Sequence, residues 1–250
     1  MLPSAMVNFT ASTQGIKTIL ARLPKSAEVF LVGGAVRDIL LKRKIKDLDL
    51  LVRKISLNQL KSQLKNLGAV DSKGEKWGVL TVKIGKQAID VALPRREKAK
   101  NTGKYFDFEI TAKPNLPVKT DLKRRDFTIN ALAWDLKKAK LLDPFGGVAD
   151  LRKKQISTVG QPKQRFAEDH SRILRALRLA AELNFKFEPK TWAALVKTVK
   201  TLPQLNIRPK IWRMELKKIT QQKKPFQVLC QKAGLVSVAG RRFAAKKYGY

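Results

Sequence analysis

Short apolar runs that alternate with polar residues occupy the chain from residue 28 to about residue 159. Alternation with a period of two is typical of strands that bury one face, and the Gly and Pro residues between the runs mark turns. Beyond residue 159 the apolar residues recur at helical spacing in the segments 167–183, 190–200, 208–221 and 226–233. The pattern therefore predicts an α/β part, a mixed sheet with helices, followed by an all-helical part.

This change of pattern predicts four consecutive parts: an N-terminal helix or extension over 1–27, a head over 28–159, a helical part over 160–235 and a basic tail over 236–250. The first part carries three basic residues and no acid, as a transit peptide does, but it lacks the apolar core of a secretion signal. We expect a cytoplasmic protein, with import into an organelle as the alternative.

No uncharged apolar run of about 18 residues occurs, so we expect no membrane-spanning helix. Cys230 is the single cysteine, which excludes an internal disulfide framework.

The charge balance is strongly basic, with 53 Lys and Arg residues against 20 Asp and Glu residues and a formal net charge of +33. This excess is larger than solubility requires and indicates a polyanionic partner. Because the charge is spread over most of the chain, nucleic acid fits better than a membrane surface. A cationic surface without a specific partner is the alternative.

A Gly-Gly pair separates a predicted strand over 28–32 from a predicted helix over 35–41. Gly33 and Gly34 would leave backbone amides bare at the positive end of the helix dipole, where an anion can approach closely. Arg37 would add a guanidinium for the same anion. The segment predicts a phosphate-binding turn, and an ordinary tight turn is the alternative.

Two acids follow in the predicted strand over 46–52. The strand period places Asp47 and Asp49 on one face and the intervening leucine on the other. Carboxylates that converge repel one another unless a cation lies between them, and hard oxygen ligands suit Mg²⁺. An exposed edge strand with two solvated acids is the alternative.

A third acid, Asp90, lies in the second of two predicted strands, 78–83 and 87–93, which meet around a Gly-Lys turn. Ile89, Val91 and Leu93 alternate along this strand and face the core, so Asp90 faces the other way. If this strand neighbours 46–52, Asp90 meets Asp47 and Asp49 and completes a carboxylate set for phosphoryl transfer. If it does not, Asp90 is a single polar residue on a wet hairpin face.

Five segments in this order and spacing resemble the class II tRNA nucleotidyltransferase and bacterial poly(A) polymerase family: 30–52, 89–97, 124–135, 141–151 and 165–185. The resemblance implies a nucleotidyltransferase head, a helical neck, and template-independent addition of nucleotides to an RNA 3′ end. Relatives usually continue into helical body and tail domains, which we expect to be largely absent here. The oligomeric state is not predicted.

The resemblance also implies roles for individual residues. Gly34 and Arg37 would hold the triphosphate, and Asp47 and Asp49 would bind the catalytic Mg²⁺. Arg125 and Asp126 would hold the ribose and phosphates. The nucleotide-binding residues of the neck helix would be Asp169, Arg172, Arg175 and Arg178.

Helical spacing separates these neck residues into two groups. Asp169 and Arg172 share a face, whereas Arg178 lies nearly opposite Asp169. We therefore interpret Asp169 and Arg172 as a base-reading pair, and Arg175 and Arg178 as partners of phosphates or of head carboxylates. Ordinary surface ion pairs are the alternative. His170, the single histidine, is expected to be an exposed helix residue.

A carboxylate that accepts and a guanidinium that donates match the exocyclic amine and ring nitrogen that cytosine and adenine share. CTP and ATP are therefore the expected substrates, and tRNA the expected partner. The segment 97–115 resembles the flexible loop that CC-only relatives lack, which favours addition of CCA or of A. Poly(A) addition, CC-only addition and a non-catalytic RNA-binding module are the alternatives.

Overall fold

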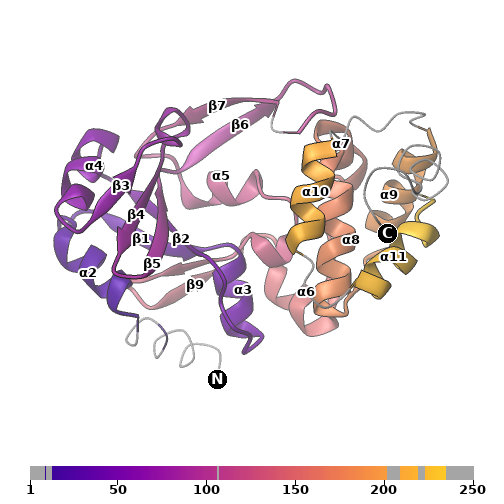
Figure 1. Cartoon of the computed structure of the whole chain (residues 1–250), viewed down its shortest axis with the longest axis horizontal. Coiled ribbons are helices and arrows are strands. Elements are labelled where there is room, and N and C mark those ends of the chain that lie inside the picture. The colour runs from indigo at the N-terminus through magenta and orange to yellow at the C-terminus, as the bar shows by residue number, and fades with distance from the viewer. Residues whose placement is uncertain (1–8, 10–12, 106, 202–208, 219–222, 235–250) are drawn as a thin grey trace. The chain divides into compact units, whose positions relative to one another are not determined.

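The computed structural model describes residues 9, 13–105, 107–201, 209–218 and 223–234. The chain forms two compact units (Figure 1). Unit 1 comprises residues 1–98 and 110–151, and unit 2 comprises residues 99–109 and 152–250. The basic tail that the sequence predicts over 236–250 lies outside the described residues.

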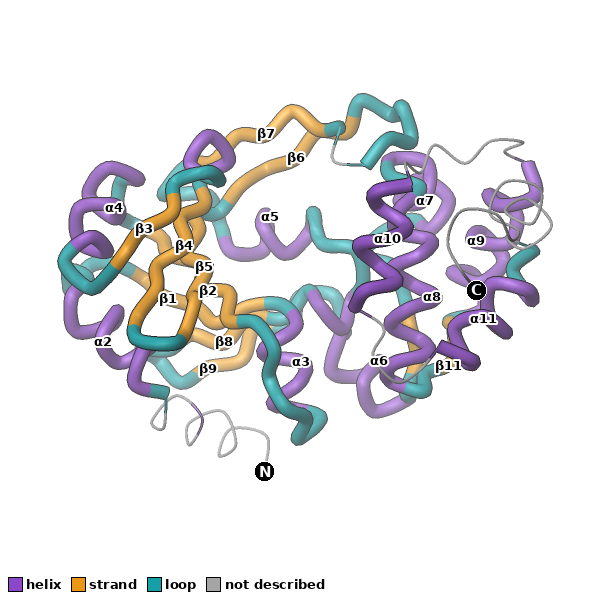
Figure 2. The backbone as a smooth tube through the Cα atoms, in the orientation of Figure 1, coloured by secondary structure: helices purple, strands orange, loops and turns teal. Residues whose placement is uncertain are grey.

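Unit 1 is built on a seven-stranded sheet with the strand order β3-β4-β5-β2-β1-β8-β9 (Figure 2). Its elements in chain order are α2 (Gln14–Arg22), β1 (Glu28–Val32), α3 (Gly34–Leu40), β2 (Leu48–Arg53), α4 (Leu57–Lys65), β3 (Ala69–Asp71), η1 (Glu75–Trp77), β4 (Val79–Ile84), β5 (Gln87–Ala92), β6 (Arg95–Ala99), β7 (Phe108–Ala112), α5 (Val118–Lys123), η2 (Thr128–Asn130), β8 (Ala133–Asp135), β9 (Lys140–Leu142) and α6 (Gly147–Lys153). The sheet is mixed because β2 and β5 pair in parallel and its other pairs are antiparallel. The mixed sheet that the sequence predicts is confirmed.

One face of this sheet is the core of unit 1. Leu31, Leu50, Val91 and Leu80 lie side by side on neighbouring strands and are at most 1% exposed. Helices α2 and α4 pack together and bury Ile16, Ile19, Leu60 and Leu64 completely. Because strand side chains alternate, the carboxylates of Asp49 and Asp90 lie on the opposite face.

Unit 2 is mainly helical. Its elements are β10 (Gln155–Ile156), α7 (Pro162–Glu168), α8 (Ser171–Leu183), β11 (Lys186–Phe187), α9 (Pro189–Thr201), α10 (Pro209–Lys218) and α11 (Lys223–Lys232). The strands β10 and β11 form a short parallel pair, so the prediction of an all-helical part over 160–235 is wrong at Lys186–Phe187, whereas β10 lies within the predicted head. Two-residue strands are too short to show any alternation in the sequence.

The single helix predicted over 167–183 is also wrong. Helix α7 ends at Glu168, α8 begins at Ser171, and Asp169 between them is extended, with φ −154° and ψ 106°. The side chain of Asp169 explains the break, because its Oδ1 accepts a hydrogen bond of 2.8 Å from the backbone N–H of Ser171. Such a local bond competes with continuation of the helix.

The strands β6 and β7 pair with each other as a hairpin apart from the main sheet. Its base belongs to unit 1 and its tip, residues 99–109, to unit 2. This segment falls within 97–115, which resembles a flexible loop in the sequence.

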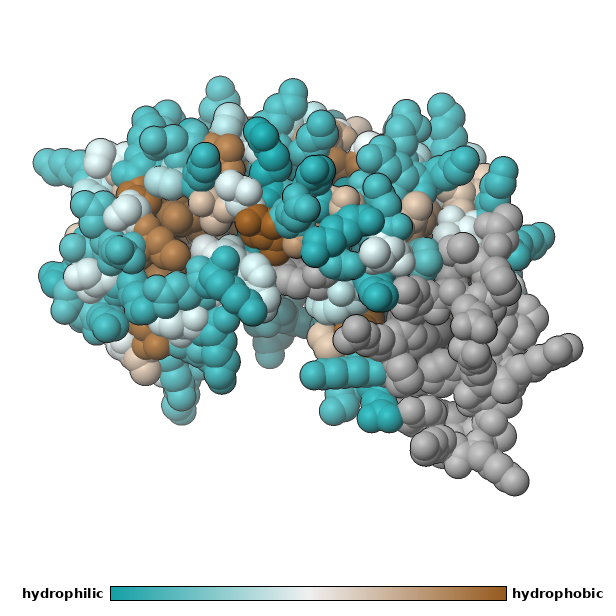
Figure 3. All heavy atoms as spheres, turned by 90° about the horizontal axis from the view of Figure 1, so that it is seen from above, coloured by the Kyte–Doolittle hydropathy of each residue, from teal (hydrophilic) through white to brown (hydrophobic). Residues whose placement is uncertain are grey.

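The face of the molecule in Figure 3 is covered mainly by hydrophilic residues, as the charge balance predicts. In the described ranges, no helix is both long enough and apolar enough to cross a membrane.

Candidate active site

Three aspartates lie close together on the face of the unit 1 sheet opposite Leu50, where Asp47 and Asp90 are exposed and Asp49 is half-buried. Asp47 comes directly before β2, Asp49 lies within it, and Asp90 lies on β5. The parallel pairing of β2 with β5 sets Asp49 directly opposite Asp90. The strand neighbourhood on which the third carboxylate depended is therefore confirmed. Thr81 on β4 donates a hydrogen bond of 2.6 Å from Oγ1 to Oδ1 of Asp90 and orients this carboxylate.

The charges around Asp49 are unbalanced. Burial raises the pKa of the Asp49 carboxyl above its usual value, the like charges of Asp90 and Asp47 add to this rise, and Arg125 and Arg124 oppose it. Acids that repel one another in this way are a donor set that a cation can bind. The part of the chain that the structure describes contains no group of three or more His, Cys, Asp or Glu side chains arranged to hold a metal ion. The case for a cation thus depends on charge and donor type.

The Gly33-Gly34 turn between β1 and α3 lies close to these acids. Gly33 has φ +74°, and a methyl group there would come within 2.5 Å of Arg125 Nη1 and 3.6 Å of Asp49 Oδ2. Only glycine fits both the conformation and the space. The N–H of Gly33 donates to Leu132 O at 3.1 Å, so this amide is not bare as the sequence suggested.

Arg125 is held at this place by Asp121, a residue that the sequence reasoning missed. Asp121 is fully buried, and its carboxylate accepts from Arg125 Nη2 at 3.4 Å and from Arg124 Nε at 2.8 Å. Burial favours the neutral acid, but the two guanidinium groups outweigh it and hold the pKa of Asp121 below its usual value. Position 121 precedes the 124–135 segment, and nothing in its local pattern marks it.

Arg37 is tied to its own neighbours. Its Nε donates to Asp38 Oδ1 at 2.8 Å and its Nη1 to Asn130 Oδ1 at 2.6 Å. The amide of Asn130 also donates to Asp126 Oδ1 at 3.3 Å, and Asp126 accepts from the backbone of Phe127 at 2.9 Å. Asn130, which sequence reasoning also missed, therefore links the predicted phosphate-binding arginine to the predicted ribose-binding aspartate.

In unit 2, Asp169 and Arg172 are both buried, each 6% exposed. The break between α7 and α8 means that they do not share a continuous helix face, so that part of the interpretation is wrong. Arg172 Nη1 donates to Glu168 Oε2 at 2.6 Å and to Arg165 O at 2.8 Å. Its guanidinium also lies 5.5 Å from the ring centre of Phe108 in the hairpin tip. Glu168, four residues before Arg172, was missed.

Arg178 pairs with carboxylates of unit 2, and not with head carboxylates as one alternative held. Its Nε donates to Glu215 Oε2 at 2.7 Å and its Nη1 to Glu182 Oε2 at 2.9 Å. Arg175 Nη1 lies 4.0 Å from Glu215 Oε1 and is about one third exposed.

His170 is buried and not exposed, so that prediction is wrong. The hairpin tip covers it: the N–H of His170 donates to Gly103 O at 3.0 Å, and a methyl group at Gly103 would lie 2.3 Å from the ring atom Cε1. Burial lowers the pKa of His170, while Asp169 opposes that shift.

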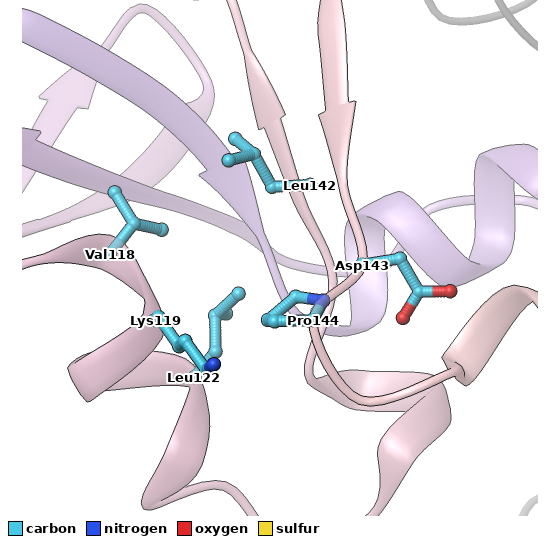
Figure 4. A pocket seen from close by; sticks show the side chains of 6 residues that line it. All are labelled: Val118, Lys119, Leu122, Leu142, Asp143 and Pro144. Atoms are coloured by element: carbon cyan, nitrogen blue, oxygen red, sulfur yellow. The ribbon is translucent and has the colours of Figure 1, made fainter.

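A cavity of about 310 Å³ in unit 1 contains none of the predicted site residues (Figure 4). It is lined by Val118, Lys119, Leu122, Leu142, Asp143 and Pro144. Both carboxylate oxygens of Asp143 accept hydrogen bonds from the first turn of α6, at Gly147 and Val148. We therefore assign Asp143 a structural role, the capping of the N-terminus of α6.

The mixed sheet, its acidic face and the glycine turn beside it define the head of a nucleotidyltransferase. The family model described as the poly A polymerase head domain matches residues 29–157, more than half of the chain. The chain belongs to this family.

Among curated relatives, the chain is 33% identical over 204 residues to a CCA-adding enzyme of Streptococcus suis (strain 05ZYH33), covering 80% of this chain and 48% of the relative. It is 38% identical over 186 residues to a CCA-adding enzyme of Enterococcus faecalis, covering 72% of this chain and 42% of the relative. The chain thus spans less than half the length of these two relatives.

Two solved structures have a similar fold. The CCA-adding enzyme of Bacillus stearothermophilus in complex with CTP gives a TM-score of 0.75 at 29% identity, covering 90% of this chain and 53% of that one. A tRNA nucleotidyltransferase complexed with a primer tRNA and an incoming ATP analog gives 0.74 at 29% identity, covering 93% and 64%.

Proposed function

We propose that this protein adds CCA, or part of it, from CTP and ATP to the 3′ end of tRNA without a template. The observation that carries the proposal is the pairing of Asp49 with Asp90 across parallel strands, with Asp47 close enough for its charge to act on Asp49. The relatives support the choice of reaction, since they are CCA-adding enzymes and the similar structures hold CTP or a primer tRNA with an ATP analog.

Mg²⁺ is the cofactor that these residues fit. Asp47 and Asp49 would hold it, with Asp90 as the third acid, because oxygen donors and an excess of negative charge are what this ion requires. When bound, the ion supplies alignment of the RNA 3′ hydroxyl with the α-phosphate and neutralises developing charge.

Other residues of unit 1 would bind the common part of the nucleotide. Arg125, which Asp121 holds beside Gly33, is placed to bind phosphates and ribose. Asp126, Gly34 and Arg37 belong to the same network through Asn130 and the turn. Arg37 would bind phosphate only by exchanging part of its contact with Asp38.

In unit 2, Asp169 and Arg172 would read the base. The Asp169 carboxylate accepts and the Arg172 guanidinium donates, which suits cytosine and adenine and opposes uracil and guanine. Arg172 Nη1 is bound to Glu168 and Arg165, whereas its Nη2 makes no hydrogen bond to the residues that the structure describes. Arg178 is assigned to structure because Glu182 and Glu215 bind it.

The test is incorporation of each labelled nucleoside triphosphate, with Mg²⁺, on tRNAs that end at successive positions before the terminal adenosine. Addition of C, C and A in that order supports the proposal. Repeated addition of A alone would identify poly(A) activity, and addition at one position only would identify CC-only or A-only activity. RNA binding without incorporation of any nucleotide would identify a non-catalytic RNA-binding module.

A further inference from the structure

A run of exposed basic residues comes directly before the first catalytic aspartate. The loop from α3 to β2 contains Lys42, Arg43, Lys44 and Lys46, all of them exposed, and Asp47 follows at once. The only residue between these cations is Ile45, and no acid occurs among residues 42–46.

The sheet brings a second basic segment to the same end of its strands. Because β2 and β5 run parallel, with Leu48 opposite Ile89, the residues that precede Leu48 and those that precede Ile89 lie at one end of the sheet. The turn before β5 carries Lys86, and Lys83 on β4 pairs with Ala88. Both lysines are exposed.

Lys83 also lies on the catalytic face of the sheet. It is two residues from Thr81, whose hydroxyl binds Asp90, and residues two apart on a strand share a face. The six side chains form what we name the edge patch: Lys42, Arg43, Lys44, Lys46, Lys83 and Lys86.

The edge patch is not neutralised by acids. None of its six side chains forms an ion pair with a carboxylate of the described residues, whereas Lys61 pairs with Glu75, Lys73 with Asp71 and Lys54 with Glu28. Exposed lysines on long stems neutralise phosphates as mobile point charges.

We propose that the edge patch binds backbone phosphates of the RNA strand whose 3′ end is extended. The inference rests on the proposed function and adds to it a surface for the polyanionic substrate. Three aspartates repel an incoming RNA strand, and cations at the same edge offset that repulsion. An extended polyanion fits open, unpaired cations on two separate segments, whereas a nucleotide requires a concave, largely enclosed site.

The variant to test is Lys42→Gln/Lys44→Gln/Lys46→Gln. Its matched control is Lys25→Gln/Lys138→Gln/Lys140→Gln, which removes the same charge. Lys25 precedes β1, Lys138 lies in the turn from β8 to β9, and Lys140 begins β9. Because Asp135 pairs with both Phe30 and Lys140, this turn lies at the end of the sheet opposite Gly33. The control residues too are exposed and form no ion pair with the described residues.

The probe is a tRNA that ends before its CCA, and its affinity is measured from about 0.05 to 0.3 M salt, with thermal unfolding as the check of folding. We expect the edge variant to bind at least tenfold more weakly at low salt. The slope of log K against log salt should fall in magnitude by about 2–3, since each phosphate contact contributes about 0.7–0.9. The control should lose less than about threefold, and the KM for CTP should stay within about threefold of wild type for both.

Equal losses in the two variants would overturn the proposal, because net charge would then act from anywhere on the surface. A raised KM for CTP with unchanged RNA affinity would also overturn it and assign the patch to the triphosphate. The binding measurement requires no turnover. If nucleotide addition fails while the edge variant still loses RNA affinity, only the proposed function is lost, and the reverse result removes only the edge patch.

Discussion

Asp49 is a partly buried acid with two like charges beside it, and the guanidinium groups of Arg125 and Arg124 oppose them. If Asp47 and Asp49 hold Mg²⁺, Asp47→Ala or Asp49→Ala should reduce turnover by at least about 1,000-fold, because alignment and charge stabilisation are lost together. RNA affinity should persist, since phosphate contacts provide it. Single-turnover incorporation and tRNA binding are the measurements, and activity retained in both variants would contradict the catalytic role.

Asp169 has two possible roles, which two substitutions separate. Asp169→Asn keeps an oxygen that can accept from the Ser171 N–H, whereas Asp169→Ala removes it. If the carboxylate reads the base, both variants should lose preference for CTP over UTP by tens- to thousands-fold in kcat/KM, since unpaired buried polar groups cost about 1–3 kcal/mol each.

Arg125→Ala is the control for this selectivity, because it should weaken all four nucleotides alike. A purely structural Asp169 predicts a different result: Asp169→Ala loses rate uniformly, keeps its CTP preference, and Asp169→Asn resembles wild type.

At the residue scale, the acids are easier to find in the sequence than the residues that contact the site. Asp47, Asp49 and Asp90 stand out because a charged residue interrupts a strand pattern. Four contacts were missed because no local pattern indicates them. Two join residues of neighbouring helical turns, Asp121 with Arg125 and Glu168 with Arg172. The other two join residues far apart in the chain, Asn130 with Arg37 and Glu215 with Arg178. His170 was placed at the surface because the hairpin tip that covers it is about 70 residues earlier in the chain.

Among the elements, the hairpin tip contacts the break between α7 and α8 through Gly103 and His170. Gly103→Ala should lower the stability of the protein by about 1–3 kcal/mol, because φ is +68° there and the methyl group would overlap the His170 ring. Gly160→Ala is the control, since φ is +84° and no atom lies within 4 Å of the added carbon.

Thermal unfolding measures this difference between the two glycines. Gly103→Ala should be worse than Gly160→Ala, and His170→Ala should recover part of the loss by removing the overlapped ring. An equal loss at both glycines would show that only backbone strain matters and that the ring contact contributes nothing.

The buried Glu215 links α10 to α8 and predicts a pH dependence. Burial would raise its pKa, but Arg178, Arg175 and Lys218 outweigh burial and hold the pKa below the usual value. The resulting stabilisation is complete above the ordinary glutamate pKa of about 4.3 and is lost as pH falls through the lowered folded value.

Glu215→Gln should therefore reduce the free energy of unfolding by about 1–3 kcal/mol at pH 7, and the difference from wild type should shrink below about pH 4. Chemical unfolding at several pH values measures it. Glu75→Gln, at a more exposed pair with Lys61, should change stability by under about 1 kcal/mol. A difference that does not change with pH would contradict the assignment.

At the element scale, prediction succeeded where a local pattern defines the element. The β1 strand, the Gly-Gly turn and α3, and the pair β4 and β5, lie within one or two residues of their predicted positions. The parallel pairing of β2 with β5 joins segments about 40 residues apart, and alternation alone does not specify which strands become neighbours. The α7–α8 break was missed because the Asp169 side-chain bond leaves the helical spacing of apolar residues unchanged.

For the whole molecule, the net charge of +33 governs how RNA affinity responds to salt. We expect log K for tRNA to fall with log salt at a slope steeper than about −4, because many phosphate contacts release many counterions. Different tRNAs should bind alike, since backbone contacts carry no sequence information. Titrations at four salt concentrations measure the slope. If the affinity does not change with salt, the positive charge does not act through phosphate contacts with tRNA.

The chain passes between the two units at residues 98/99, 109/110 and 151/152, because unit 2 includes the tip of the β6–β7 hairpin. No single cleavage can therefore release both units whole. A fragment that begins at residue 152 would lack Gly103 and Phe108, which cover His170 and the Arg172 guanidinium. To obtain unit 2 with these contacts, residues 99–109 would have to be supplied as a separate peptide or fused to that fragment.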